Sequence, residues 1–244
     1  MMRVLLLGGT SEGRALAARL YPDVDVISSL AGRVPDPALP VGEVRVGGFG
    51  GVEGMRRWLV DSKVDAVVDA THPYAATITA HTAAVCDDLG LPHLVLARPA
   101  WPRGDAIGVG SDAEAAKTVA AEHYSRVFLT TGRSGAAPFA DVDAWFLIRA
   151  VTAPDANTLP RHHQLVLSRG PYHFDDELAL LRDHHIDALV TKNSGGQMTR
   201  PKLDAAAALG VAVVMVDRPP LPPGVATVST VDDAAAWVRS TGSC

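Results

Sequence analysis

The sequence predicts an α/β protein made of two Rossmann-like domains with parallel sheets. Short apolar runs alternate along the whole chain with amphipathic stretches of helical length, which is the pattern of strands joined by right-handed crossovers. Hydrophobic residues make up 48% of the 244 residues and aromatic residues only 5%, which suits short buried strands covered by helices of small residues. The same alternation then starts a second time, which indicates a second domain of the same kind.

Each half contributes its own series of elements. In the first half the pattern predicts strands at 4–7, 24–27, 44–46, 66–69 and 94–96, and helices at 12–20, 52–61 and 74–89. In the second half it predicts strands at 127–129, 165–167, 188–190 and 211–216, and helices at 176–184 and 199–209.

An internal duplication relates the two halves. Moving the sequence by 120 residues brings 98–116 onto 218–236, with eight identical residues in nineteen positions. Each copy holds a stiff proline-rich arm, RPxxPxG, and then a short strand and a helix that we expect Asp112 or Asp232 to cap. Such arms would allow the halves to exchange terminal strands. We therefore expect a first domain of residues 1–97 and a second of 98–244, with 225–240 able to pack on either.

Composition excludes several classes of function. A net charge of −5 disfavours nucleic-acid binding, which needs a basic surface. No window approaches the ~20 apolar residues of a membrane span, and no targeting segment precedes the first strand, so a cytoplasmic protein is expected. The nine His residues lack a metal-ligand spacing, so we predict no metal site, and Cys86 and Cys244 do not indicate a disulfide framework.

A glycine-rich loop, GGTSEG at residues 8–13, follows the first predicted strand and opens a helix. Its spacing is that of the dinucleotide-binding G-x-G-x-x-G motif with Thr10 at the middle glycine. Gly8 would allow the tight turn and Gly13 the close packing of helix on sheet. Thr10 and Ser11 would add hydroxyl donors at a helix start that favours a pyrophosphate. A purely structural turn is the alternative, but the context favours cofactor binding by Gly8, Gly9, Thr10, Ser11 and Gly13.

The end of the second predicted strand favours NADPH over NADH. An NAD site commonly has Asp or Glu about 20 residues beyond the glycine loop, whereas an Arg accommodates the 2′-phosphate of NADP. Ser28, Ser29 and Arg33 stand here, and no carboxylate lies between Asp25 and Arg33. These hydroxyls and the cation predict a phosphate pocket.

Two further loops of the first half belong to the predicted site. The glycine run 47–51, which includes Gly48, either flanks the adenine or is only a connector. The segment DATHPY at 69–74 follows a buried strand, so Thr71 and His72 are expected near the nicotinamide. His72 would donate a proton or a hydrogen bond to the substrate, or would only fix the turn at Pro73.

Three strand ends of the second half carry polar loops with a cation each. These are TTGR at 130–133, SRGPY at 168–172 and TKNSGG at 191–196, and the ends of parallel strands meet at one edge of a sheet. Because Arg binds carboxylates with two hydrogen bonds, the repeated cations predict a substrate with several carboxylates. The predicted substrate-binding residues are Thr130, Thr131, Gly132, Arg133, Arg169, Lys192, Ser194 and Gly195.

Together these motifs identify a family. LLLGGTSEGRALA, SSLAGR, DATHPYA, TTGR, SRGPY and TKNSGG, in this order and over nearly the whole chain, closely resemble the precorrin-6A (precorrin-6x) reductase family of cobalamin biosynthesis. The resemblance implies NADPH-dependent reduction of the precorrin-6A macrocycle to precorrin-6B (dihydroprecorrin-6). It also implies that the anionic tetrapyrrole is bound between two Rossmann-like domains. Its acetate and propionate groups would explain the cationic loops.

The proton donor and two other functions stay open. His72 is the first candidate for proton donor or orienting group, followed by Lys192 and Tyr74. A non-catalytic NADP-binding redox sensor would leave the cations of the second half without a role. A methyltransferase of the same pathway is disfavoured by Arg33, since S-adenosylmethionine has no phosphate. Neighbouring enzymes of the pathway are candidate partners.

Overall fold

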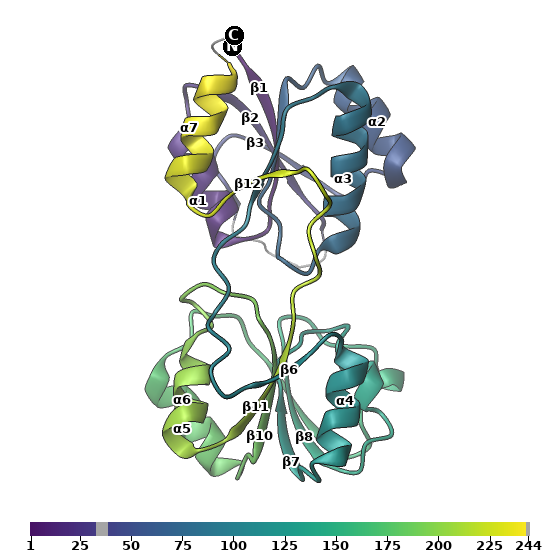
Figure 1. Ribbon diagram of the computed structural model, residues 1–244, viewed down its shortest axis with the longest axis vertical. Coiled ribbons are helices and arrows are strands. Elements are labelled where there is room, and N and C mark those ends of the chain that lie inside the picture. The colour runs from purple at the N-terminus through teal and green to yellow at the C-terminus, as the bar shows by residue number, and fades with distance from the viewer. Residues whose placement is uncertain (33–38, 243–244) are drawn as a thin grey trace. The chain divides into compact units, whose positions relative to one another are not determined.

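The computed structural model describes residues 1–32 and 39–242 and divides the chain into two compact units. The first unit combines Met1–Pro99 with Pro219–Cys244, and the second is Ala100–Arg218. Each unit contains one six-stranded sheet in which every strand pair is parallel (Figure 1).

The elements of the two units follow one plan. The first unit contains β1 (Arg3–Leu7), α1 (Ser11–Leu20), β2 (Asp25–Leu30), β3 (Glu43–Val46), α2 (Gly51–Asp61), β4 (Ala66–Asp69), α3 (Ala76–Leu89), β5 (His93–Leu96), β12 (Ala226–Val228) and α7 (Val231–Thr241). The second unit contains β6 (Ile107–Val109), α4 (Asp112–Ala121), β7 (Arg126–Leu129), the 3-10 helix η1 (Ala137–Phe139), β8 (Trp145–Ala150), the 3-10 helix η2 (Ala156–Thr158), β9 (His163–Leu167), α5 (Phe174–Asp183), β10 (Ala188–Lys192), α6 (Pro201–Leu209) and β11 (Ala212–Val216).

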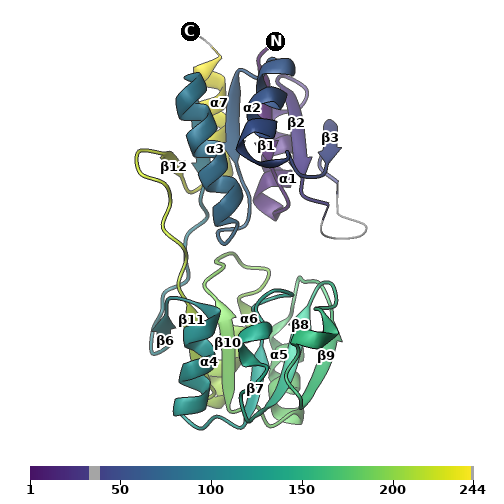
Figure 2. The same cartoon turned by 90° about the vertical axis from the view of Figure 1, so that its right-hand side faces the viewer.

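Strand order is the same in both sheets. The first runs β12-β5-β4-β1-β2-β3 and the second β6-β11-β10-β7-β8-β9, each a doubly wound order in which the first strand lies in the middle. In the first unit α1 and α7 cover one face of the sheet and α2 and α3 the other (Figure 1). In the second unit α5 and α6 share one face of the sheet and α4 lies on the other (Figures 1 and 2). The 3-10 helix η1 packs against α4. The predicted fold class and its duplication are confirmed.

The duplicated halves exchange their terminal segments. β6 follows the first arm but pairs with β11 of the second sheet, and β12 follows the second arm but pairs with β5 of the first sheet. In Figure 1 the yellow end of the chain accordingly returns to the sheet that contains β1. Segment 225–240, which the sequence left open between the domains, therefore lies in the first unit.

The exchanged helix α7 completes the core of the first unit. Ala234, Ala235 and Val238 are fully buried and pack in one cluster with Leu16 and Leu20 of α1. The small side chains allow α7 to lie directly against α1 and the sheet. Deleting α7 would expose this cluster, so α7 is part of the core that supports the first strand.

Hydroxyl residues, not the predicted aspartates, cap the two exchanged helices. The Ser111 hydroxyl accepts from the Glu114 N–H at 3.1 Å, and the Thr230 hydroxyl accepts from the Asp233 N–H at 3.1 Å. Asp112 and Asp232 stand in the first turn, where the helix dipole favours a carboxylate.

A buried ion pair holds β8, a strand that is not among those predicted from the sequence although the apolar run 145–148 precedes Arg149. The Arg149 guanidinium pairs with the Glu177 carboxylate of α5 through both oxygens, with Nη2 2.9 Å from Oε2. The guanidinium carbon also lies 3.7 Å from the ring centroid of Tyr172 and 4.8 Å from that of Phe128. The partners make burial of the charge possible.

Lys202, in the first turn of α6, is buried beside this pair. Its Nζ lies 5.1 Å from the ring centroid of Trp101. Burial and the charge of Arg149 lower the pKa of Lys202 to about 7, and the charge of Glu177 only partly opposes them.

Replacing Glu177 by Ala should strongly destabilise the second unit, because Arg149 would keep a buried charge without its partner. We expect the free energy of unfolding to fall by about 3–5 kcal/mol, measured by urea denaturation. Asp204→Ala is the control, since it breaks the Arg200–Asp204 pair of the same unit, whose side chains are 38% and 45% exposed, and should change stability by less than about 1 kcal/mol. Equal effects of the two substitutions would contradict this role of the pair.

Lys202→Met should stabilise the protein in a pH-dependent way. Below pH 7 Lys202 is charged in both the folded and the unfolded protein, so the full cost of burying its charge lowers the stability of the wild type. Between about 7 and the ordinary value of 10.5 the unfolded chain holds the proton and the folded chain does not, so wild-type stability rises with pH. The gain from the substitution should therefore shrink over this range, by at most ~1.4 kcal/mol per pH unit. If the free energy of unfolding changed with pH in the same way for wild type and Lys202→Met, this prediction would be wrong. Lys117→Met, at an exposed lysine, is the control.

Candidate functional site

The glycine-rich loop lies at the carboxyl edge of the first sheet, between β1 and α1. The Gly8 N–H donates to the Ser29 carbonyl of β2 at 3.0 Å. Gly9 has φ +110°, and a Cβ there would meet no atom within 4 Å. The left-handed backbone thus falls on Gly9 and not on Gly8. The loop presents open backbone beside the start of α1, as an anion site requires.

Thr10 and Gly13 fix the loop to the fold. The Thr10 hydroxyl accepts from the Gly13 N–H at 3.0 Å and donates to the Ala70 carbonyl at 2.6 Å. A Cβ on Gly13 would lie 3.4 Å from Gly8 Cα, so glycine permits this close approach. The Ser11 hydroxyl donates to Glu12 at 3.0 Å. Both hydroxyls that the sequence offered as cofactor donors therefore have partners within the loop region.

The acidic residue in the first turn of α1 is neutralised. Glu12 Oε2 lies 2.9 Å from Nη1 of Arg98, at the end of the first unit's β5 segment. Burial raises the pKa of Glu12, but its own backbone N–H and the charge of Arg98 outweigh burial, so the pKa is lowered. The carboxylate is thus ionised and paired, which reduces its repulsion of an anion at the loop.

At the end of β2 the structure adds a cation that the sequence motifs do not indicate. Arg45 of β3 lies in register with Ser29 and donates from Nη1 to the Ser29 hydroxyl at 2.7 Å. Ser28 is buried, and its hydroxyl has no hydrogen-bond partner among the described residues. The predicted Arg33 lies outside the residues that the structure describes. Only the cross-strand register relates Arg45 to Ser29, which is why inspection of the loop after β2 misses it.

The glycine run also meets this edge. Arg45 donates to the carbonyls of Gly47 and Gly48, both at 3.1 Å, and the Gly47 N–H donates to the Leu30 carbonyl at 2.8 Å. Gly48 therefore lies beside Arg45 and the end of β2.

Asp69 organises the loop with Thr71 and His72. Its Oδ1 accepts from the Thr71 N–H at 2.9 Å and hydroxyl at 2.6 Å, and its Oδ2 accepts from the Thr79 hydroxyl at 2.6 Å. His72 is exposed, and its Nδ1 accepts from the Tyr74 N–H at 3.3 Å. The two rings lie 5.6 Å apart. Because Nδ1 is the acceptor, the neutral imidazole carries its proton on Nε2.

In the second unit Lys192 joins two of the predicted loops. Its Nζ donates to the Thr131 carbonyl at 2.8 Å and lies 3.6 Å from Oδ2 of Asp112. Burial raises the pKa of Asp112, and the Lys192 charge opposes that shift. The Thr130 hydroxyl and N–H both donate to the Val190 carbonyl. These contacts bring 130–133 next to the loop that follows β10.

Trp101 fixes that loop from the first arm. Its backbone N–H donates to Asn193 Oδ1 at 2.8 Å, its carbonyl accepts from Asn193 Nδ2 at 3.1 Å, and its indole N–H donates to the Gly196 carbonyl at 3.0 Å. Ser194 and Gly195 stand between these anchors. In the neighbouring loop the Tyr172 N–H donates to the Met198 carbonyl at 3.0 Å, and Arg169 is exposed.

A cavity of about 430 Å³ opens beside Arg133, which is exposed. Ser134, Asp155 and Thr158 also line it, from the segments that follow β7 and β8. β7 occupies the place of β1 in the sheet order, but η1 follows it in place of a long helix. Arg133 of the second unit therefore follows its strand at the place where the first unit has the start of α1.

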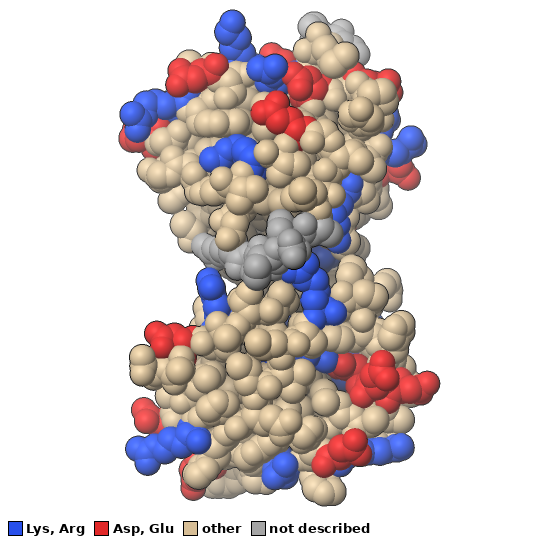
Figure 3. All heavy atoms as spheres, turned by 180° about the vertical axis from the view of Figure 1, so that it is seen from behind, with Lys and Arg blue, Asp and Glu red and all other residues tan. Residues whose placement is uncertain are grey.

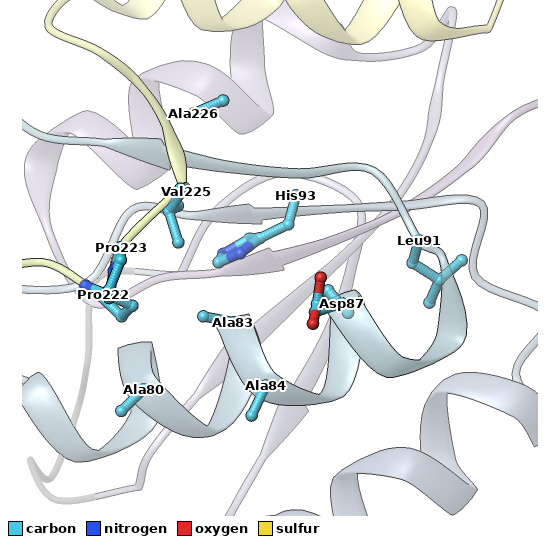
Figure 4. A pocket seen from close by; sticks show the side chains of 12 residues that line it. Ala80, Ala83, Ala84, Asp87, Leu91, His93, Pro222, Pro223, Val225 and Ala226 are labelled. Atoms are coloured by element: carbon cyan, nitrogen blue, oxygen red, sulfur yellow. The ribbon is translucent and has the colours of Figure 1, made fainter.

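A second cavity, of about 500 Å³, lies in the first unit between α3, β5 and the returning segment 222–226 (Figure 4). His93 and Asp87 project into it among alanine and proline side chains. Burial lowers the pKa of His93, against the charge of Asp69, and its Nε2 has no partner in the described part of the chain. Since His93 starts β5, this cavity is apart from the carboxyl-edge loops.

The surface carries mixed charge. On the face drawn in Figure 3, Lys and Arg side chains alternate with Asp and Glu over both units. Within residues 1–32 and 39–242, no helix has the length and apolarity needed to cross a membrane.

Comparison with known proteins identifies relatives over the full length. Residues 3–239 match the family model "Precorrin-6x reductase CbiJ/CobK". The chain is 70% identical over 238 residues to a precorrin-6A reductase of Mycobacterium tuberculosis and 53% identical over 243 residues to one of Rhodococcus erythropolis, with 98% of each chain covered in both cases.

A solved structure agrees. The structure described as CobK precorrin-6A reductase is similar with a TM-score of 0.91 and 32% identity, over 99% of this chain and 98% of that chain. The predicted family and the predicted enzyme class, a reductase, are confirmed. With its two doubly wound sheets and their loops, this chain belongs to the precorrin-6x reductase family.

Proposed function

We propose that the chain catalyses the NADPH-dependent reduction of precorrin-6A to precorrin-6B, a cytoplasmic step of cobalamin biosynthesis. The observation that carries the proposal is the open backbone at Gly9, beside the start of α1 and at the carboxyl edge of a doubly wound sheet, in a member of a reductase family. The cationic loops of the second unit support an anionic substrate.

The residues of the first unit fit a dinucleotide. Gly8, Gly9 and the start of α1 suit the pyrophosphate, and the Glu12–Arg98 pair limits repulsion there. Ser28 and Ser29 stand at the ribose end, with Gly48 beside them, and Thr71 stands at the opposite end. Bound NADPH would supply the hydride. The residues around it bind and orient the cofactor and limit access of water.

The residues of the second unit fit a polycarboxylate. Arg133 and Arg169 are exposed and can each bind a carboxylate with two hydrogen bonds. Lys192 braces the loop at Thr131 and adds a third positive charge. Backbone groups of Gly132, Ser194 and Gly195 and the partly exposed Thr130 complete the proposed surface. The Thr131 side chain is buried, so Thr131 contributes through its carbonyl, which accepts from Lys192.

A proton must reach the atom next to the one that receives the hydride. His72 is the best candidate, because its exposed ring, once protonated, can give the Nε2 proton to the substrate and return to the neutral form whose Nδ1 accepts from the Tyr74 N–H. Lys192 is less suited, since its Nζ already contacts Thr131 and Asp112. Tyr74 holds the His72 ring through its backbone, which suits a positioning role.

The wild-type protein should consume NADPH only when precorrin-6A is present, as followed by the loss of NADPH absorbance. Gly9→Ala should raise KM for NADPH about tenfold or more, because its Cβ forces the loop out of its left-handed conformation. Gly90→Ala is the matched control, because Gly90 also has positive φ and open space but only ends α3.

The two glycine variants separate loop geometry from general strain. Both should lose a similar free energy of unfolding, roughly 1–2 kcal/mol, but only Gly9→Ala should weaken NADPH binding. No NADPH consumption by wild type with precorrin-6A, or binding of S-adenosylmethionine in its place, would refute the proposed function.

His72→Ala should lower kcat about 100-fold with little change in KM for NADPH, because a positioned acid contributes to the transition state and not to cofactor binding. Single-turnover measurements of NADPH oxidation would test this. His81→Ala on α3 is the control. A kcat near that of wild type would remove His72 from the proton-donor role.

A further inference from the structure

Arg45 is a partly buried cation, and the groups that contact its guanidinium within residues 1–32 and 39–242 are neutral. Its guanidinium donates to the Ser29 hydroxyl at 2.7 Å and to the Gly47 and Gly48 carbonyls at 3.1 Å. Its guanidinium carbon lies 3.9 Å from the ring centroid of Phe49 and 5.2 Å from that of Trp58. No carboxylate pairs with Arg45 in the part of the chain that the structure describes.

Other arginines of the same unit are compensated. Arg3 pairs with Asp25 at 2.7 Å, Arg19 with Asp232 at 3.1 Å and Arg98 with Glu12 at 2.9 Å. Burial alone lowers the pKa of Arg45, although the guanidinium remains charged at any physiological pH. A partly buried cation among neutral groups attracts an incoming anion more strongly than a fully solvated cation does.

The guanidinium has donors to spare. Arg has five N–H groups, and the contacts above use both on Nη1 and one on Nη2. The Nε–H and the second Nη2–H remain, and these neighbouring nitrogens can form two parallel hydrogen bonds with an oxyanion. Phe49 and the two glycine carbonyls hold the group in one orientation, so little conformational entropy would be lost on binding.

Arg45 also lies close to the position expected for the adenosine ribose of a bound dinucleotide. The Gly8 N–H contacts Ser29 of β2, and Ser29 is in register with Arg45 of β3. Neighbouring strands lie about 4.8 Å apart, so Arg45 starts about 10 Å from β1. In a doubly wound sheet the adenosine ribose of a dinucleotide lies at the end of the second strand, between these two places.

We propose that Arg45, together with the Ser29 hydroxyl, binds the 2′-phosphate of the dinucleotide and sets the preference for NADPH over NADH. The inference rests on the proposed function in one respect, that the first unit binds a nicotinamide dinucleotide. A loop-anchoring role alone would affect both cofactors equally, whereas a phosphate contact affects only the phosphorylated one.

The experiment measures equilibrium binding of NADPH, NADH, 2′,5′-ADP and 5′-AMP to the full-length protein and to Arg45→Gln. We expect Arg45→Gln to weaken NADPH and 2′,5′-ADP about 10- to 100-fold, the range of a charge-assisted hydrogen bond, and to change NADH and 5′-AMP by about twofold or less. Arg57→Gln on the exposed side of α2 removes the same charge and should leave all four affinities unchanged.

Arg45→Lys keeps the charge but not the paired donors, and should retain part of the preference with NADH binding as in wild type. Equal losses for NADPH and NADH in both variants, or an unchanged ratio, would overturn the inference while the wild type still bound NADPH. A wild type that bound neither dinucleotide would overturn the proposed function and the inference with it.

Discussion

The exchange of terminal segments is the constraint on which both units depend. β5 would be an exposed sheet edge without β12, and the cluster around Leu16 and Leu20 would face solvent without α7. In the second unit the segment after the first arm has the equivalent place, because β6 is the outer strand of the sheet and α4 contributes buried Ala115, Ala116 and Val119. The core of the first unit therefore needs chain from before the first arm and from after the second, whereas the second unit is the continuous segment Ala100–Arg218. The chain passes between the units twice, and the first sheet and its core are complete only after the second passage.

On this common plan the two sheets offer different chemistry at the same edge. In the first unit a long helix follows the central strand, so glycine backbone and a helix start face the ligand side, as a pyrophosphate requires. In the second unit η1 follows the equivalent strand, and Arg133 stands beside a cavity there. The planar guanidinium of an arginine, with its paired N–H donors, suits separate carboxylates better than the start of a helix does. The presence of η1 in the place of α1 thus agrees with our proposal that the first unit binds a nucleotide and the second a polycarboxylate.

Local patterns in the sequence were sufficient for the fold class, the duplication and the glycine loop, since each depends on short-range periodicity or spacing. They raised the exchange of terminal segments as a hypothesis but did not decide on which unit 225–240 packs. They did not indicate β8, Lys202 or Arg45. In each case the decisive partner is distant in the chain: Glu177 for Arg149, Trp101 for Lys202, and Ser29 across the strand pair for Arg45. A buried charge reads as a surface residue until its partner is known. The signal for Arg45 would have been the register of β3 against β2, which puts Arg45 opposite Ser29, and not the composition of either strand.

The hydroxyl groups of the motifs also have partners within the fold that the sequence motifs do not indicate. Thr10 caps α1 and contacts Ala70, Thr71 and Thr79 both donate to Asp69, and Thr130 donates to Val190. These bonds hold the loops in one geometry before any ligand arrives, which is the preorganisation that a reductase needs to position a hydride donor. In our proposal binding itself then falls to backbone N–H groups and to the cations beside these loops. The motifs build the loops, and we propose that the charges beside them select the ligand.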